Sequence, residues 1–433
     1  WVLRNTVKKF SDFVAYPVKM DISRTETEKD EEGKPVEGGK EETVITTETL
    51  NSMKAIWLRP KNEVTDEEYN EFYKHISHDW TEPLTRIQAK IEGTLEYQLL
   101  LYIPSKAPFD LFHQGGNKHG IHLYIKRVFI MDDCKDLLPE YLRFIKGVVD
   151  LEDLSLNISR EMLQQDRQIQ RMGKGIVSKV LGTLGDMAKK GEEEYLKFWF
   201  EFGRVLKEGL FQDHENQETI LGLSRFASTN HSEDLTSLKD YIDRMKPEQE
   251  AIYFMTGESR EVVEQSPHLE AFLEKGYEVL ILSEPVDEVW TQSPISFEEK
   301  SFQSIGKGNV ELGSEEEKKE AEETRKEKEK EFSSLLECIQ KKLDEDVKEV
   351  RLSSRLTTSA VCLVSEQGDL SPQLEQMMKS MGQAMPNTKR ILEVNPNHEI
   401  LTKVQGIYDA NQEDAALGDY AELLYGQAVL AEG

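Results

Sequence analysis

Residues 155–165 read Ser-Leu-Asn-Ile-Ser-Arg-Glu-Met-Leu-Gln-Gln. They follow two apolar, β-rich runs at 124–130 and 144–150, so the pattern predicts a sheet, a loop and then the start of a helix. Ser159 suits the N-cap of that helix, and Glu161 suits its first turn, where the helix dipole favours an acid. The stretch therefore indicates an α/β fold with polar side chains at a helix start.

Two side chains of this helix start suit a negatively charged ligand. Arg160 and Gln164 are four residues apart, so they project from one helix face. A guanidinium offers a fixed fork of donors and keeps its charge, which suits an oxyanion or a phosphate. On spacing alone, an ordinary surface arginine is the more common case.

Length and charge narrow the class of protein. The chain has 433 residues, enough for two to four domains, and carries 82 acidic against 54 basic residues, a formal net charge of −28. This balance argues against general nucleic-acid binding, which needs basic faces to displace counterions. No apolar run is long enough to predict a membrane span, and no signal peptide is visible.

The cysteine and histidine spacings predict no metal site and no disulfide framework. Cys134, Cys338 and Cys362 form no CxxC pair and suit structural thiols. His119 and His122 lie near His113, but a three-residue step along a strand places side chains on opposite faces. The run Met172-Gly-Lys-Gly175 lies in a helical stretch and lacks the Gly-Lys-Ser/Thr ending of a phosphate loop. Its basic neighbours are expected to form a solvated helix side and not a nucleic-acid site: Arg167, Arg171, Lys174 and Lys179.

The chain contains two tracts that are rich in charged residues. Residues 24–42 read RTETEKDEEGKPVEGGKEE between apolar runs and predict a hairpin with a long, mobile tip. Residues 315–331 read EEEKKEAEETRKEKEKE, which cannot bury a face and predicts a solvated helix or a linker.

Between these tracts the pattern alternates between strands and helices, which favours layered α/β units. A long amphipathic helix is predicted from Ile169, Met172, Ile176, Val180 and Leu184, which recur at spacings of three and four. The predicted strands are 55–58, 95–103, 122–131, 250–255 and 277–282, and the other predicted helices are 66–75, 213–226, 235–244 and 258–275.

Near the C-terminus, apolar residues fall at helical spacing in two otherwise polar segments. Leu370, Leu374, Met377, Met378 and Met381 form the first set, with Pro372 in the first turn. Methionine is adaptable and is overused at promiscuous binding surfaces, although a core position is equally compatible with the spacing. The second set comprises Leu417, Ala421, Leu424 and Ala428. These residues form an apolar stripe on the last predicted helix, and we expect a partner to cover it.

Several long motifs together resemble one family, the bacterial branch of the ninety-kilodalton heat-shock protein (Hsp90) chaperones. Beside residues 155–165, the resemblance is carried by four stretches: NTVKKFSDFVAYP at 5–17, LYIPSKAPF at 101–109, LLPEYLRF at 137–144 and EVNPNH at 393–398. It extends over nearly the whole chain and covers the middle and C-terminal domains, with no counterpart of the family's N-terminal nucleotide-binding domain.

The resemblance implies an α/β (α+β overall) architecture with a middle domain at 1–305. That domain would hold a large α/β/α unit at 1–150, a catalytic loop and helical coil at 151–212, and a small α/β/α unit at 213–305. A charged linker or solvated helix at 306–330 and a smaller mixed α/β dimerisation domain at 331–433 would follow. The family pattern continues beyond Gly433 through another amphipathic helix, which predicts only a weak dimer for this chain.

For function, the resemblance implies part of an ATP-driven dimeric clamp. Arg160 would contact the γ-phosphate of ATP, with Gln164 ordering the site, while ATP and Mg bind the nucleotide domain. The full-length protein is expected to be an ATPase, and this chain alone is expected to bind no cofactor and to be inactive. The alternative is a client- or co-chaperone-binding scaffold with no role in ATP hydrolysis.

The resemblance also implies partners and contact residues. Partly folded clients would contact Leu370, Leu374, Met377 and Met378, an acidic-aromatic pair formed by Glu288 with Val289 or Trp290, and an exposed Trp57. The family usually shows a bulky aromatic where Met378 stands. The other implied partners are a second copy of the chain and the general bacterial folding chaperone system, in the cytoplasm, with no nucleic acid or membrane partner.

Overall fold

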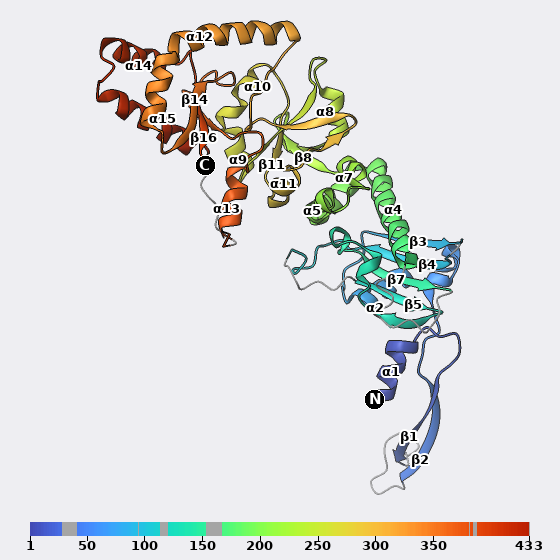
Figure 1. Cartoon of the computed structure of the whole chain (residues 1–433). Helices are drawn as coiled ribbons and strands as arrows, with labels where there is room; N and C mark the ends of the chain where they lie inside the picture. The colour runs from blue at the N-terminus through green and yellow to red at the C-terminus, as the bar shows by residue number, and fades with distance from the viewer. Residues whose placement is uncertain are drawn as a thin grey trace. The chain divides into compact units, whose positions relative to one another are not determined.

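The computed structural model describes residues 1–27, 41–93, 95–112, 120–152, 167–380, 382–383 and 388–432. The chain packs into two compact units, Trp1–Val205 and Leu206–Gly433, which we describe separately (Figure 1). The domain boundaries at 305 and 330 stay predictions.

The first unit contains the predicted hairpin, which follows a short N-terminal helix. Strands β1 (Lys19–Thr27) and β2 (Glu41–Thr49) pair antiparallel along their whole length, and the tip of the hairpin lies outside the described residues. The helices in the described residues of this unit are α1 (Val2–Ser11), α2 (Asp66–Ser77), α4 (Arg167–Lys190) and most of α5 (Glu192–Lys207), with 3-10 turns η1 (Ile56–Leu58), η2 (Lys61–Glu63), η3 (Lys135–Leu137) and η4 (Glu140–Leu142).

A mixed five-stranded sheet forms the centre of this unit, in the order β3-β4-β7-β5-β6. Its strands are β3 (Thr85–Ile91), β4 (Tyr97–Ile103), β5 (Gly120–Ile125), β6 (Val128–Met131) and β7 (Lys146–Leu151). Side chains of β4 alternate between two faces: Leu100 and Tyr102 join the aromatic cluster of α2, while the Tyr97 hydroxyl lies against Gly175 of α4. The sheet therefore has a helix on each face, as the predicted layered α/β unit requires.

Helix α4 confirms the amphipathic pattern read from the sequence. The five residues of its apolar stripe, from Ile169 to Leu184, are all buried. Gly173 permits close packing, because a Cβ atom there would lie 2.8 Å from the carbonyl oxygen of Asp136. The Met172–Gly175 run is thus a helical packing surface and not a phosphate loop.

Two local predictions are wrong. Residues 55–58 do not form a strand, because the Leu58 N–H donates to Ala55 O at 3.1 Å and closes the turn η1. The helix expected at 258–275 is broken into α9 (Arg260–Glu264), η5 (Pro267–Leu269) and α10 (Glu270–Glu274), since Ser266 caps a new turn that starts at Pro267.

The second unit contains a mixed six-stranded sheet in the order β12-β13-β10-β11-β8-β9. Strand β10 runs parallel to both of its neighbours, β11 and β13. The elements are α6 (Gly209–Gln212), α7 (Gln217–Leu223), β8 (Arg225–Ser228), β9 (His231–Ser237), α8 (Leu238–Arg244), β10 (Ala251–Thr256), β11 (Leu280–Leu282), α11 (Pro285–Trp290), β12 (Ser296–Phe297) and β13 (Lys300–Ser304).

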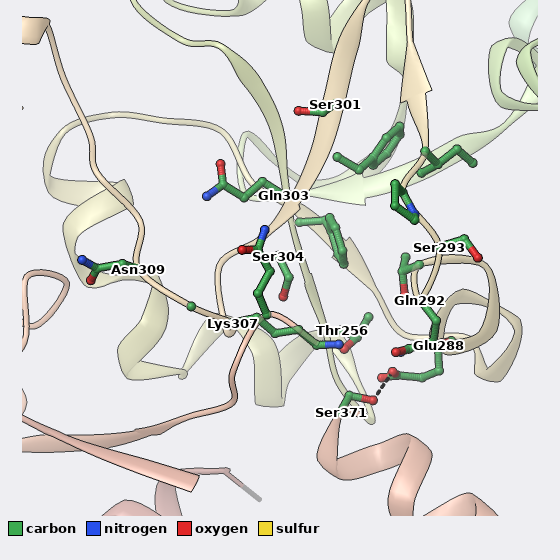
Figure 2. Close-up of a pocket in the computed structure, with 17 residues that line it drawn as sticks. Thr256, Glu288, Gln292, Ser293, Ser301, Gln303, Ser304, Lys307, Asn309 and Ser371 are labelled. Atoms are coloured by element: carbon green, nitrogen blue, oxygen red, sulfur yellow. Dashed lines mark hydrogen bonds between the residues drawn. The ribbon is translucent and has the colours of Figure 1, made fainter. Parts of the chain in front are cut away.

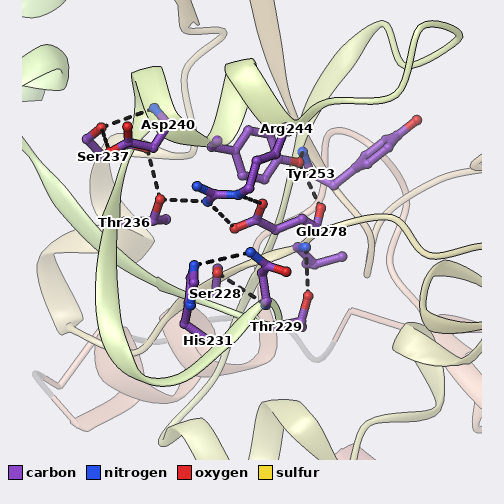
Figure 3. A network of polar contacts seen from close by, with 12 residues as sticks. Ser228, Thr229, His231, Thr236, Ser237, Asp240, Arg244, Tyr253 and Glu278 are labelled. Carbon is purple, nitrogen blue, oxygen red and sulfur yellow. Dashed lines mark hydrogen bonds and ion pairs between the residues drawn. The ribbon is translucent and has the colours of Figure 1, made fainter.

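A polar network fastens α8 to this sheet (Figure 3). Arg244 donates to both carboxylate oxygens of Glu278, at 2.9 and 2.8 Å, and to the Thr236 hydroxyl at 2.7 Å. The Tyr241 hydroxyl donates to the carbonyl oxygen of Glu278 and accepts from the Tyr253 N–H. Because the arginine contact is bidentate, it fixes the orientation of the helix as well as its position.

The same unit ends in a three-stranded sheet, in the order β14-β16-β15, against which helices pack. Its elements are α12 (Glu315–Lys342), β14 (Val347–Leu352), β15 (Val361–Val364), α13 (Pro372–Ser380), β16 (Arg390–Val394), α14 (Glu399–Ala410) and α15 (Ala416–Glu432). The tract at 315–331 is therefore a solvated helix, with no buried residue before Phe332.

The apolar stripe of α15 corrects one expectation. Leu417, Ala421, Leu424 and Ala428 lie at helical spacing, as predicted, but they pack into the unit's own core with residues of α12 and β14. A partner protomer is not needed to cover this stripe. The large apolar side chains of α15 that remain exposed are Leu423, Val429 and Leu430.

Candidate functional site

The predicted phosphate-contacting pair lies outside the described residues. Strand β7 ends at Leu151 and helix α4 begins at Arg167, so Arg160 and Gln164 belong to the connection between them. Their role stays a prediction. The predicted helix start at Ser159 also lies outside the described residues and stays a prediction.

Trp57 is a core residue, which contradicts its predicted exposure. It is 1% exposed and packs among Phe13, Phe72 and Tyr124, with ring centroids 4.9 to 5.7 Å away. Its Nε1–H donates 2.9 Å to Oδ2 of Asp150, because a buried indole needs an acceptor. Burial raises the pKa of Asp150, and the donated hydrogen bonds from Trp57 and the Arg127 backbone partly oppose that rise.

Trp290 is buried as completely as Trp57. It is 1% exposed, packs edge-on against Phe302 and donates its Nε1–H to Oδ1 of Asp287 at 2.8 Å. Lys207 Nζ donates to both oxygens of the same carboxylate, at 2.7 and 2.9 Å. Trp290 therefore belongs to a buried ion-pair network and offers no surface to a client, whereas Val289 is half-buried.

Glu288 links α11 to α13. Its side chain is buried, and its Oε2 accepts a hydrogen bond from the Ser371 hydroxyl. The same hydroxyl oxygen accepts from the N–H of Leu374 at 3.2 Å and thus caps α13, with Pro372 at the first helical position. Ser371 was not singled out from the sequence, although the pair Ser371-Pro372 is a typical helix start.

The apolar residues in and just before α13 comprise one core residue and three half-buried ones. Leu374 is 7% exposed, so its predicted accessibility is wrong: it lies on the face that packs inward. Leu370, Met377 and Met378 are half-buried, and the helix contacts α11. Met381 lies outside the described residues. The apolar part of α13 that a partner can reach is therefore formed by Met377 and Met378, preceded by Leu370.

Lys307, in the segment after β13, is the cation that acts on Glu288 electrostatically. Lys307 Nζ donates 2.7 Å to the carbonyl oxygen of Asp369, and burial lowers the pKa of this lysine, with Glu288 and Asp369 opposing that shift. Glu288, Lys307 and Ser371 line one cavity (Figure 2). Nothing in the sequence pattern brings these three residues together.

Comparison with known proteins decides the family. The profile described as "Hsp90 protein" matches residues 21–433. The chain belongs to the Hsp90 family. This Hsp90-family chain is 56% identical over 440 residues to "Chaperone protein HtpG" from Nocardia farcinica, with all of the chain and 67% of the relative covered.

Other Hsp90-family relatives agree. The chain is 54% identical to "Chaperone protein HtpG" of Rhodococcus jostii over 432 residues and 53% identical to that of Mycobacterium tuberculosis over 435. All of the chain and 66% of each of these two relatives are covered, so the chain spans about two thirds of their length. The resemblance stated from the motifs is confirmed.

The described residues contain neither a helix fit to span a membrane nor a cluster fit to hold a metal ion. None of the helices in the described ranges combines the length and apolar character that crossing a bilayer requires. Within the same ranges, no cluster of three or more histidine, cysteine or acidic side chains is arranged to hold a metal ion.

Proposed function

We propose that this chain is the client-binding and self-associating part of a molecular chaperone. The observation that carries the proposal is its identity of 53 to 56% with proteins named chaperone HtpG, over its whole length. The formal net charge of −28 supports it, because a strongly charged surface keeps a protein dispersed while it holds sticky partners.

Met377 and Met378 form the client contact in this proposal, with Leu370 beside them. They are half-buried on a short helix whose start is fixed by the Ser371 cap, so an adaptable apolar surface is presented on a firm base. Trp57, Trp290 and Leu374 are not part of this contact, because each is needed in a core. Glu288 supports the helix through Ser371.

The chain's part in ATP turnover is proposed from Arg160. In the longer family protein, ATP and Mg would be held outside these 433 residues, and hydrolysis would supply the free energy of the clamp cycle. Arg160 would donate to γ-phosphate oxygens and Gln164 would help to order the site. An arginine used in this way contributes on the order of 10³ to 10⁵ in rate.

Self-association would use the exposed part of the C-terminal helices. Leu423 and Leu430 are 56% and 84% exposed on α15, and residues 390–433 would form the contact of a weak homodimer. The expected mass in sedimentation rises with protein concentration. We further propose that the protein acts in the cytoplasm and that the general bacterial folding chaperone system is one of its partners.

Suppression of client aggregation tests the client contact. We expect the double variant Met377→Ser/Met378→Ser to suppress the aggregation of a heat-unfolded enzyme less well while melting within a few degrees of the parent. Gln376→Ser is the matched control, because Gln376 is an exposed polar residue on the same helix. Equal suppression by all three proteins would remove α13 from the proposal.

Steady-state ATP hydrolysis in the full-length family protein tests the arginine. Arg160→Ala is expected to lower turnover at least tenfold and to leave nucleotide affinity unchanged, while this chain alone hydrolyses no ATP. Unchanged turnover would favour the scaffold alternative, in which the chain binds clients or co-chaperones without taking part in hydrolysis.

A further inference from the structure

A cavity of about 430 Å³ lies between β10, β13 and the start of α13 (Figure 2). Its volume falls within the range of about 300–1,000 Å³ that is usual for small-molecule pockets. Its lining includes Phe254 and Thr256 of β10, residues 301–304 of β13, Glu288 of α11 and Ser371. All of these residues belong to the second unit.

Glu288 has unused hydrogen-bonding capacity in this cavity. The residue is 7% exposed, and while Oε2 accepts from Ser371, Oε1 has no hydrogen-bond partner among the described residues. An unpartnered carboxylate oxygen in a buried position costs free energy. The cavity wall therefore provides a strong acceptor for a donor that a ligand would bring.

Lys307 provides the complementary donor. In Figure 2 the side chains of Lys307 and Glu288 reach toward each other from opposite sides of the cavity, and they attract each other electrostatically. An ammonium has three N–H donors, and the carbonyl oxygen of Asp369 takes one of them. A group that both donates and accepts, such as a hydroxyl, can therefore join the two charges without adding a charge of its own.

The other residues that line the cavity also suit a ligand with hydroxyl groups. Hydroxyl and carboxamide side chains, each able to donate and accept, line the cavity at Thr256, Gln292, Ser293, Gln303, Ser304 and Asn309. Phe254 and Phe302 add apolar ring surface suited to C–H groups. We propose that this cavity binds a small, uncharged polyhydroxy compound, with one hydroxyl donating to Glu288 Oε1 and accepting from Lys307.

Such a ligand would also stabilise α13. Ser371 donates to Glu288 and caps the first turn of that helix, so a ligand that fixes the Glu288 carboxylate fixes the cap as well. Binding is then expected to slow hydrogen exchange at the Leu374 amide. This site is separate from the proposed client contact and does not depend on it.

The test is ligand-observed saturation transfer on the 433-residue chain, with sorbitol and trehalose as probes. We expect saturable binding, with affinity reduced about tenfold or more in Glu288→Gln and in Lys307→Met, because each change removes a charged hydrogen-bonding partner. Glu288→Gln retains an acceptor for Ser371 and preserves side-chain volume. Gln303→Ala is a further variant that leaves the buried carboxylate untouched, and it is also expected to weaken binding.

Matched controls distinguish specific binding in this cavity from general stabilisation by an added solute. Glu311→Gln removes one exposed acid from outside the cavity and should bind both probes like the parent. Glycine betaine, which is excluded from protein surfaces but has no hydroxyl group, should stabilise all variants equally without saturation transfer. Absence of saturable polyol binding, or equal affinity in the parent and Glu288→Gln, would overturn the proposal. So would saturable binding of N-acetyl-trialanine amide without polyol binding, which would indicate a peptide site.

Discussion

Trp57 and Trp290 are buried tryptophans in different units, and in both the indole N–H needs a hydrogen-bond acceptor. Each is 1% exposed, and each donates its indole N–H to a buried aspartate, Asp150 or Asp287. The partners of the two carboxylates differ. Asp150 accepts only uncharged N–H donors among the described residues, whereas Asp287 also pairs with the ammonium of Lys207.

The aspartate and its partners, and not the tryptophan, therefore determine the electrostatic character of each core. At Trp57 the indole N–H is one of few groups that satisfy a desolvated charge. At Trp290 the indole N–H adds to a carboxylate that an ion pair and the Glu284 N–H already satisfy. Loss of the indole should therefore cost more stability at Trp57, whereas the site of Trp290 should depend mainly on Lys207.

The largest effect is expected from Lys207→Met. Lys207 and Asp287 have side-chain exposures of 5% and 1%, so removing the cation leaves a buried and uncompensated carboxylate. We expect the urea-unfolding free energy of the second unit to fall by about 3–5 kcal/mol. The double variant Lys207→Met/Asp287→Asn removes both charges and should recover much of the loss. A single variant as stable as the parent would mean that Trp290 and Glu284 hold Asp287 without the lysine.

A smaller effect is expected when each tryptophan becomes phenylalanine. Both changes remove the indole N–H and a similar volume, so the difference between them reports the aspartate. Trp57→Phe leaves Asp150 with the Arg127 N–H, whereas Trp290→Phe leaves Asp287 with its ion pair. Trp57→Phe should cost about 1–2 kcal/mol more.

Trp80→Phe is the matched control for both tryptophan variants, because Trp80 is 84% exposed and should tolerate the change. Equal losses at the two buried sites would show that packing, and not the state of the carboxylate, dominates. In that case the partners of Asp150 and Asp287 would not explain what each tryptophan contributes to stability.

The smallest effect concerns pH. Burial raises the pKa of Asp150 above its usual value of 3.8, so the folded protein binds this proton more readily than the unfolded chain. Between the unfolded and folded pKa values, the contribution of Asp150 to stability therefore decreases as the pH rises. Asp150→Asn should remove this decrease, which urea titrations at several pH values between 4 and 7 can detect. An unchanged pH profile would place the titration elsewhere.

Periodicity in the sequence predicted the elements whose burial follows a regular spacing. The stripe from Ile169 to Leu184 in α4 and the stripe of α15 are both buried as spaced. Spacing alone does not say which surface covers a stripe, which is why a partner was expected where the unit's own core lies. The same ambiguity placed Leu374 on the exposed side of α13.

Local hydrogen bonding accounts for the elements that periodicity missed. The run Ala55-Ile-Trp-Leu58 is short and apolar, and such a run fits a strand or a tight turn equally well until its carbonyl partners are known. The meeting of Glu288, Lys307 and Ser371 depends on long-range packing between α11, α13 and the segment after β13. No pattern within any one of these segments predicts it.

Helix α12 has a consequence for local stability. Its 28 residues rise about 42 Å along the axis, yet its buried residues begin only at Phe332. The first turns depend on the Ser314 capping box and on exposed pairs such as Lys326 with Glu322. Salt weakens such pairs, so this half should fray and re-form many times for each unfolding of the core. A protease that cuts after lysine or arginine would then cleave here in a native chain, faster at high ionic strength, while the anchored half stays folded.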